Sequence, residues 1–125
     1  MDKYFIEASE DSPSILFDGE VGLIEIKGKS LPEDAKACYS QLQHLVKEYI
    51  KSPLSNTRLN FRLEYLNSSS AKKILEIITL LEELPPRGFH VEIKWFFNAD
   101  DEDMHEEGEE FRRMTDIPIS LEKEH

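Results

Sequence analysis

The sequence is short of cysteine and has no long apolar run, and each shortage excludes a class of protein. Cys38 is the only cysteine among 125 residues, so no internal disulfide can form and an oxidising compartment is not indicated. No stretch approaches the roughly 20 apolar residues that a membrane-spanning helix needs. Asp2, Glu7 and Glu10 interrupt the N-terminal segment before the apolar run of a signal peptide develops. These features predict a cytoplasmic protein.

Basic residues are also scarce relative to acidic ones. The chain has 15 Lys and Arg against 26 Asp and Glu, a formal net charge of −11. Such a field repels phosphate backbones and anionic head groups, so we expect neither nucleic acid nor a membrane as a partner. Basic protein surfaces are better candidates. With 39% hydrophobic residues, the chain can bury one modest core, which predicts a single domain over residues 1–125.

Motifs for catalysis and metal binding are missing too. The sequence contains no GxSxG, P-loop or GxGxxG motif, and its four histidines lack the spacing of paired metal ligands. Cys38 falls on the apolar stripe of a predicted helix, which favours core packing over catalysis. The sequence therefore predicts a protein that is not an enzyme and holds no metal or cofactor.

The apolar residues that are present follow alternating strand and helix periods. Strands are expected around residues 4–6, 15–17, 21–27, 58–65 and 91–97, with a hairpin turn at Asp18-Gly19. One helix is predicted to hold Pro32 in its first turn and to end at Ser52-Pro53, a second to follow three serines, and a third to span residues 101–114. Residues 117–121 are compatible with a short strand or an extended tail.

The resulting order is β-β-β-α-β-α-β-α, an α/β domain with parallel neighbours where strands and helices alternate. Two strands have strictly alternating inner faces: Leu59, Phe61, Leu63 and Tyr65 in one, and Val91, Ile93, Trp95 and Phe97 in the other. Strands buried on both faces would be continuously apolar instead. The alternation therefore predicts two layers, a mixed sheet with its helices mainly on one face.

A serine cluster, Ser68-Ser69-Ser70, follows Asn67 between a predicted strand and a predicted helix. Ligand sites in open α/β sheets gather at strand ends, and a helix N-terminus offers free N–H groups and a positive dipole end to a phosphate. Lys72 and Lys73 lie one turn further on. Phosphorylation here would add about −1.5 to −2 charge units. The alternative interpretation is that asparagine and serine only cap the helix.

An acidic run, residues 100–110, holds eight carboxylates in eleven positions. It lacks the ligand order and glycine of an EF-hand loop, and it places no carboxylate pair in an apolar cleft. Met104, Gly108 and Phe111 share one helical face, so the run predicts an amphipathic helix with a solvated acidic side. A contact surface for a basic partner and a small metal-binding protein remain the alternatives.

Two separated motifs give the chain a family resemblance from about residue 5 to residue 120. The first is Tyr65-Leu66-Asn67-Ser68-Ser69-Ser70 before an apolar helix, and the second is Trp95-Phe96-Phe97 with the acidic runs Asp100-Asp101-Glu102-Asp103-Met104 and Glu107-Gly108-Glu109-Glu110-Phe111. In this order they resemble the SiaC family of bacterial regulatory phosphoproteins. That family is similar to the STAS domains of anti-sigma-factor antagonists in its element order and in having a switch residue at a helix start.

The resemblance implies a partner-switching role in biofilm regulation. A serine/threonine kinase would phosphorylate the residue after the Leu-Asn pair, Ser68 here, and a PP2C-type phosphatase would reverse the reaction. The dephosphorylated form would bind and activate a diguanylate cyclase, raising cyclic-di-GMP. Serine stands here where a member of that family carries threonine, and Ser69 is the alternative acceptor. The partner surface is expected at Asn67, Ser69, Ser70, Lys72 and Lys73. An anti-sigma-factor antagonist is the alternative function.

Overall fold

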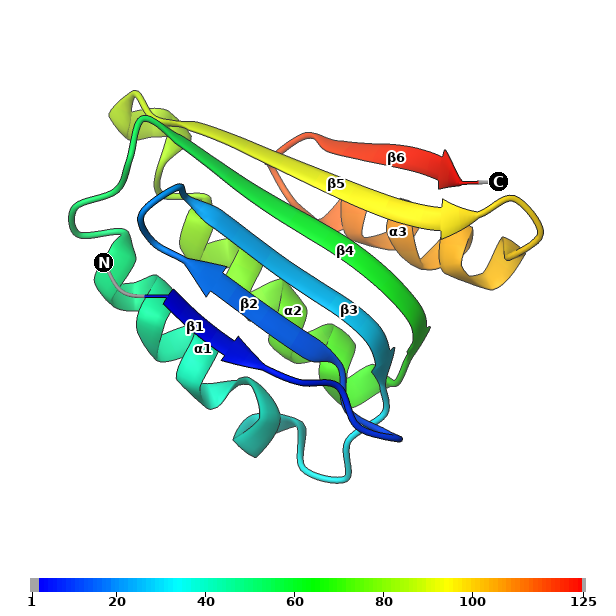
Figure 1. Cartoon of the computed structure of the whole chain (residues 1–125). Coiled ribbons are helices and arrows are strands. Elements are labelled where there is room, and N and C mark those ends of the chain that lie inside the picture. The colour runs from blue at the N-terminus through cyan, green and yellow to red at the C-terminus, as the bar shows by residue number, and fades with distance from the viewer. Residues whose placement is uncertain (1–2, 125) are drawn as a thin grey trace.

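One six-stranded sheet runs through the protein, with its strands side by side in the order in which they occur in the chain (Figure 1). The computed structural model describes residues 3–124, so Met1, Asp2 and His125 of the expected domain lie outside the described residues. The strands are β1 (Lys3–Ile6), β2 (Ser14–Asp18), β3 (Leu23–Ser30), β4 (Asn56–Leu66), β5 (His90–Asn98) and β6 (Ile119–Glu124). The helices are α1 (Ala35–Tyr49), α2 (Ser68–Leu81) and α3 (Glu102–Met114), with a 3₁₀ turn η1 (Pro85–Arg87).

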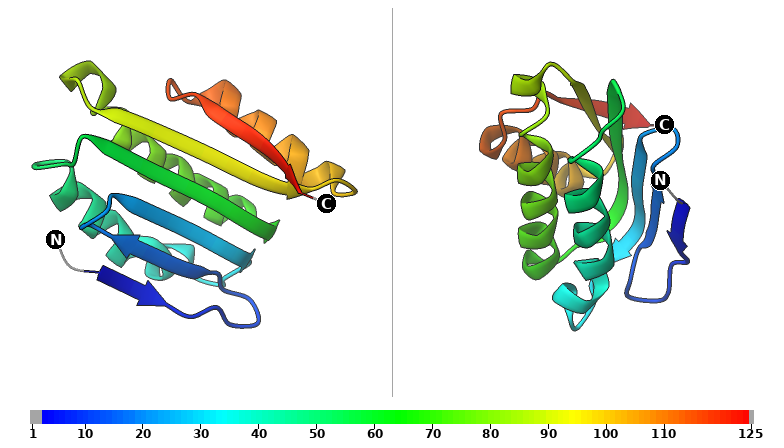
Figure 2. Two further views of the ribbon diagram at one scale, coloured as in Figure 1. Left: turned by 45° about the horizontal axis from the view of Figure 1, so that its top comes forward. Right: turned by 90° about the vertical axis from the view of Figure 1, so that its left-hand side faces the viewer.

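The sheet is mixed. The first two pairings, β1 with β2 and β2 with β3, are antiparallel, and the following three are parallel. All three helices cover the same face of the sheet, as the edge-on view in Figure 2 shows. The predicted two-layer mixed fold is therefore confirmed, and the segment that was compatible with a strand or a tail forms the edge strand β6.

The core lies between the sheet and its helices. Period-2 alternation points Ile24, Ile26, Leu59, Phe61, Ile93 and Trp95 of the central strands toward the helices, and all are at most 1% exposed. Apolar stripes of α1 and α2 close over them, including Leu42, Val46, Ile74, Ile77 and Ile78. This buried layer fixes the positions of the strand ends, from which the loops and helix starts emerge.

The predicted start of the first helix is wrong by about one turn. Pro32 is buried in the loop before the helix, and α1 begins at Ala35. Asp34 is the N-cap, and its carboxylate accepts a hydrogen bond from the Ala37 N–H at 3.0 Å. An aspartate side chain satisfies one of the free N–H groups of the first turn, which proline cannot do. Cys38 on this helix is half-buried and packs against the edge of the core.

The prediction that Tyr65 faces the core is also wrong. Gly28 of β3 pairs with Leu63 of β4, and the next residue, Lys29, pairs with Tyr65, so Glu64 is an extra residue in its strand. Such a bulge shifts the alternation by one position. Tyr65 consequently lies 58% exposed. On β5, the predicted inner-face residue Phe97 is only half-buried because it lies near the end of its strand.

Candidate functional site

The serine cluster forms the first turn of α2, and its geometry is set by the residue before it. Asn67 is the N-cap, and its side-chain oxygen accepts a hydrogen bond from the Ser70 N–H at 2.8 Å. Its amide group also donates to the Pro32 carbonyl at 3.4 Å, which ties the helix start to the loop after β3. Ser68 and Ser69 are exposed, whereas Ser70 is fully buried. The three serines therefore occupy two different environments.

Ser70 belongs to a buried chain of hydroxyl groups beneath the helix start. The Ser30 hydroxyl at the end of β3 donates to the Ser70 hydroxyl at 2.8 Å and lies 2.6 Å from the Tyr39 hydroxyl of α1. Burial raises the pKa of Tyr39 well above its ordinary value, so this phenol stays protonated. The Asn67 N–H donates to the Ser30 carbonyl at 3.0 Å. Buried hydrogen bonds thus connect β3, α1 and α2 at the start of α2.

The surface around Ser68 is partly apolar. Tyr65 at the end of β4 is 58% exposed, and Leu31 in the neighbouring loop is 39% exposed. The Lys29 ammonium lies 5.8 Å from the centre of the Tyr65 ring. An exposed aromatic ring and an exposed leucine in the segments that lead to and contact the start of α2 are suited to contact with another protein.

The predicted contact residues differ in their exposure to solvent. Asn67, Ser69 and Lys72 are at least partly accessible, and Lys73 is half-buried in an ion pair with Glu76 at 3.2 Å. Ser70 has no surface on which a partner could bind, so its role is to hold the helix start in place. The structure brings all of these residues to one end of α2.

Sequence reasoning missed Tyr39 and Ser30, the two residues that anchor this site from below. Tyr39 lies four residues after Ala35 and three before Leu42, so the helical period already placed it on the buried stripe. Its position therefore had a signal in the sequence. Ser30 had none, because only the fold brings the end of β3 to within hydrogen-bond distance of residues on two helices.

The acidic run forms α3 as expected, with Met104, Gly108 and Phe111 buried on its inner face. Asp101 is the N-cap, and its carboxylate accepts from the Met104 N–H at 3.0 Å. Gly108 lets the helix lie directly against Trp95, whose indole N–H donates to the Met104 carbonyl at 2.9 Å. Over residues 3–124, no three His, Cys, Asp or Glu side chains are grouped so that they could hold a metal ion. No helix in that range is long and apolar enough to cross a membrane.

Comparison with known proteins places this architecture in a defined group. The model of the SiaC family of regulatory phosphoproteins matches residues 6–124. An uncharacterized protein of Pseudomonas aeruginosa (strain UCBPP-PA14) is 30% identical over 122 residues, which are 98% of this chain and 97% of that protein. SiaC of Pseudomonas aeruginosa, solved alone, has a TM-score of 0.90 at 28% identity, over 99% of this chain and 100% of that one.

A second solved structure is the complex of the diguanylate cyclase SiaD with its activator SiaC from Pseudomonas aeruginosa. The matched chain gives a TM-score of 0.90 at 29% identity, and the likeness covers 97% of this chain and 99% of that one. The likeness in fold and sequence therefore extends over nearly the whole protein. The chain belongs to the SiaC family of regulatory phosphoproteins.

Proposed function

We propose that this protein binds and activates a diguanylate cyclase when Ser68 is unphosphorylated, and that phosphorylation of Ser68 by a serine/threonine kinase blocks this binding. A PP2C-type phosphatase reverses the modification. The proposal is supported by the likeness to SiaC of Pseudomonas aeruginosa, which is described as the activator of the cyclase SiaD. The protein then acts through binding and performs no chemistry of its own.

The observation that carries the proposal is the contrast between Ser68 and its surroundings. Ser68 is exposed at the first position of α2, while Asn67 and the buried Ser70 hold the backbone on both sides of it. A kinase can therefore reach the hydroxyl without unfolding the helix. A phosphate at this position meets the free N–H groups and the dipole of the helix start, so the fold tolerates it.

The effect of the phosphate falls on the surface of the protein. It adds about −1.5 to −2 charge units at the exposed start of α2. If one or two charge-assisted contacts of about 1.5–3 kcal/mol are lost with the cyclase, its affinity falls by tenfold or more. Loss of a few contacts is thus enough for a switch.

The first experiment is peptide mass spectrometry of the protein isolated from its own cells. We expect a phosphate on Ser68 that is absent from the Ser68→Ala variant and retained in Ser69→Ala. A phosphate that moves to Ser69, or a chain that is unmodified under all growth conditions, would contradict the assignment of Ser68.

The second experiment tests the partner. In cells that lack the gene, Ser68→Ala should restore cyclic-di-GMP to at least the parent level, and Ser68→Glu should leave it several-fold lower. Equal cyclic-di-GMP in both strains, with both variants present at the same level, would remove the cyclase from the proposal. An anti-sigma-factor antagonist would give that result while keeping the phosphate on Ser68.

A further inference from the structure

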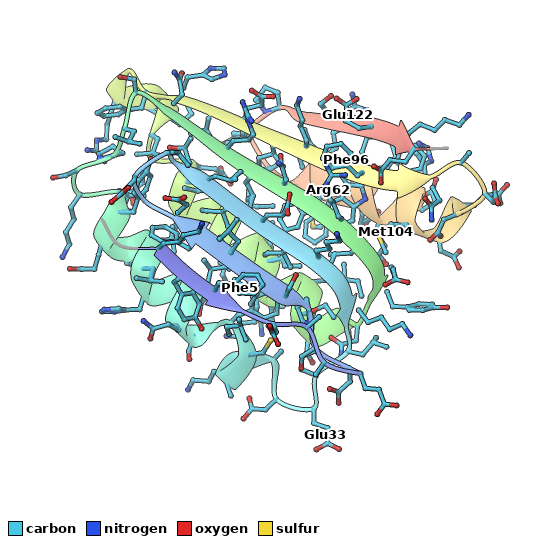
Figure 3. All side chains as sticks on the ribbon, in the orientation of Figure 1. Phe5, Glu33, Arg62, Phe96, Met104 and Glu122 are labelled. Atoms are coloured by element: carbon cyan, nitrogen blue, oxygen red, sulfur yellow. The ribbon has the colours of Figure 1, made fainter. Side chains whose placement is uncertain are left out.

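A groove of about 1330 Å³ opens at the end of the sheet where β4 and β5 finish and α3 begins. Aromatic side chains from both strands line it, namely Tyr65, Phe96 and Phe97, and α3 contributes one wall. Figure 3 shows Phe96 beside Arg62 on the face of the sheet that carries no helix. The groove is thus formed by parts of the chain that are far apart in sequence.

The wall from α3 is acidic. Asp103, Glu106 and Glu107 of the helix and Asp100 in the turn before it line the groove, and none of them forms an ion pair with another residue between 3 and 124. Burial raises the pKa of the Glu107 carboxyl, and the negative charges of Glu110 and Asp103 raise it further. Two cationic side chains, Lys27 and Arg62, also line the groove, against seven carboxylates, so an excess of negative charge remains.

The second half of the same helix is different. Glu109 pairs with Arg112 at 3.3 Å, and Glu110 pairs with Arg113. These residues do not line the groove. Two carboxylates in the second half of α3 are thus paired with arginines, whereas the carboxylates that line the groove are not.

The protein itself shows how the groove holds a cation. The guanidinium of Arg62 lies 3.7 Å from the centre of the Phe96 ring and 2.9 Å from a carboxylate oxygen of Glu124. An aromatic face with a nearby carboxylate is a favourable site for arginine, because it combines cation–π attraction with an ion pair. Phe97 and the exposed Tyr65 lie further along the same groove as the unpaired carboxylates.

We propose that this groove is a docking site for a segment of a partner protein that carries arginine or lysine residues next to apolar ones. Charge complementarity identifies the cationic part of the segment, and the aromatic lining identifies the apolar part. The inference does not depend on phosphorylation of Ser68 or on the identity of the cyclase. Docking here places the partner within a few residues of the switch, because Tyr65 and Leu66 of the groove lead directly into Asn67 and Ser68.

The test uses the full-length protein and a fluorescein-labelled 12-residue peptide of alternating arginine and leucine, with binding followed by fluorescence anisotropy at physiological salt. Asp103→Lys/Glu107→Lys should weaken binding by about tenfold or more. The matched control is Glu33→Lys/Glu83→Lys, which makes the same change in net charge outside the groove and should change binding by less than about twofold. Glu33 lies far from Phe96 in Figure 3.

Equal losses in the two double variants would overturn the proposal, since they would show attraction to the net charge alone. Unmodified protein gives a second measurement that does not depend on the variants folding. Amide NMR shifts on adding the peptide should concentrate in residues 64–66 and 96–107, and shifts scattered over the surface would contradict a groove. A Ser68→Glu protein should bind the peptide at least as well as the parent, which separates this site from the switch.

Discussion

Ser69 and Ser70 are neighbours of the same chemical type with opposite environments, and this contrast locates the rigid part of the site. Ser70 is fully buried and accepts a hydrogen bond from Ser30, whereas Ser69 is exposed. A buried donor that loses its acceptor costs the full desolvation penalty of that group. The start of α2 is consequently held in place by a buried hydrogen bond, while its exposed residues are accessible to a binding partner.

This contrast predicts the stability of two alanine variants. Ser70→Ala should lower the free energy of unfolding by about 1–3 kcal/mol, because the Ser30 hydroxyl then has no acceptor at that position. Ser69→Ala should change it by less than about 0.5 kcal/mol. Urea unfolding followed by circular dichroism measures both. Similar losses in the two variants would mean that the hydroxyl chain contributes no stability.

At the scale of secondary-structure elements, α3 is positioned by its contact with β5. An added Cβ at Gly108 would lie 2.6 Å from Trp95 Cδ1 and 2.7 Å from Leu121 Cδ2. The Trp95 ring is fully buried and hydrogen-bonded to the Met104 carbonyl, so it has little freedom to move. The absence of a side chain at Gly108 therefore allows α3 to lie this close to the sheet.

Gly108→Ala should accordingly destabilise the protein by about 1–3 kcal/mol, although alanine has the higher helix propensity by about 1 kcal/mol. The overpacking against Trp95 outweighs that gain. Guanidinium unfolding monitored by tryptophan fluorescence measures the change, since Trp95 is the only tryptophan. A variant more stable than the parent would show that the helix can shift without cost.

The elements were largely predictable from sequence because each carries its own periodicity. Alternation in β4 and β5 gave the strands, their inner faces and the two-layer arrangement, and the caps on α2 and α3 follow from local residue types. The bulge at Glu64 was not predictable, because it arises from pairing with β3 and leaves no mark in the alternation of β4 itself. The same holds for the groove and for Ser30, which depend on contacts between distant segments.

At the scale of the whole molecule, the excess of negative charge affects stability through carboxyl groups that folding buries. Burial is the main cause of the raised pKa of Glu107 and of Glu82. The folded state then holds a proton more tightly than the unfolded state, whose glutamates have a pKa of about 4.3. Each such group therefore lowers the free energy of unfolding progressively as pH rises above about 4.3.

Glu107→Gln removes the ionisable carboxyl at this half-buried position and with it the loss of stability at higher pH. The variant should be more stable than the parent at pH 7, by a few degrees in Tm at most, and this advantage should disappear near pH 3, where the parent's carboxyl is protonated in both states. Thermal unfolding of both proteins at the two pH values measures the difference. An advantage of the same size at both values would point to packing rather than charge.

The match between strand order in the sheet and strand order in the chain has a consequence for synthesis. As the polypeptide leaves the ribosome from its N-terminus, the neighbour of every new strand has already been made. No strand has to be inserted between two that are already in place, and the sheet grows from one side only. During translation the sheet can therefore assemble by adding each new strand to the same edge. Assembly of the sheet is complete when β6 has been added.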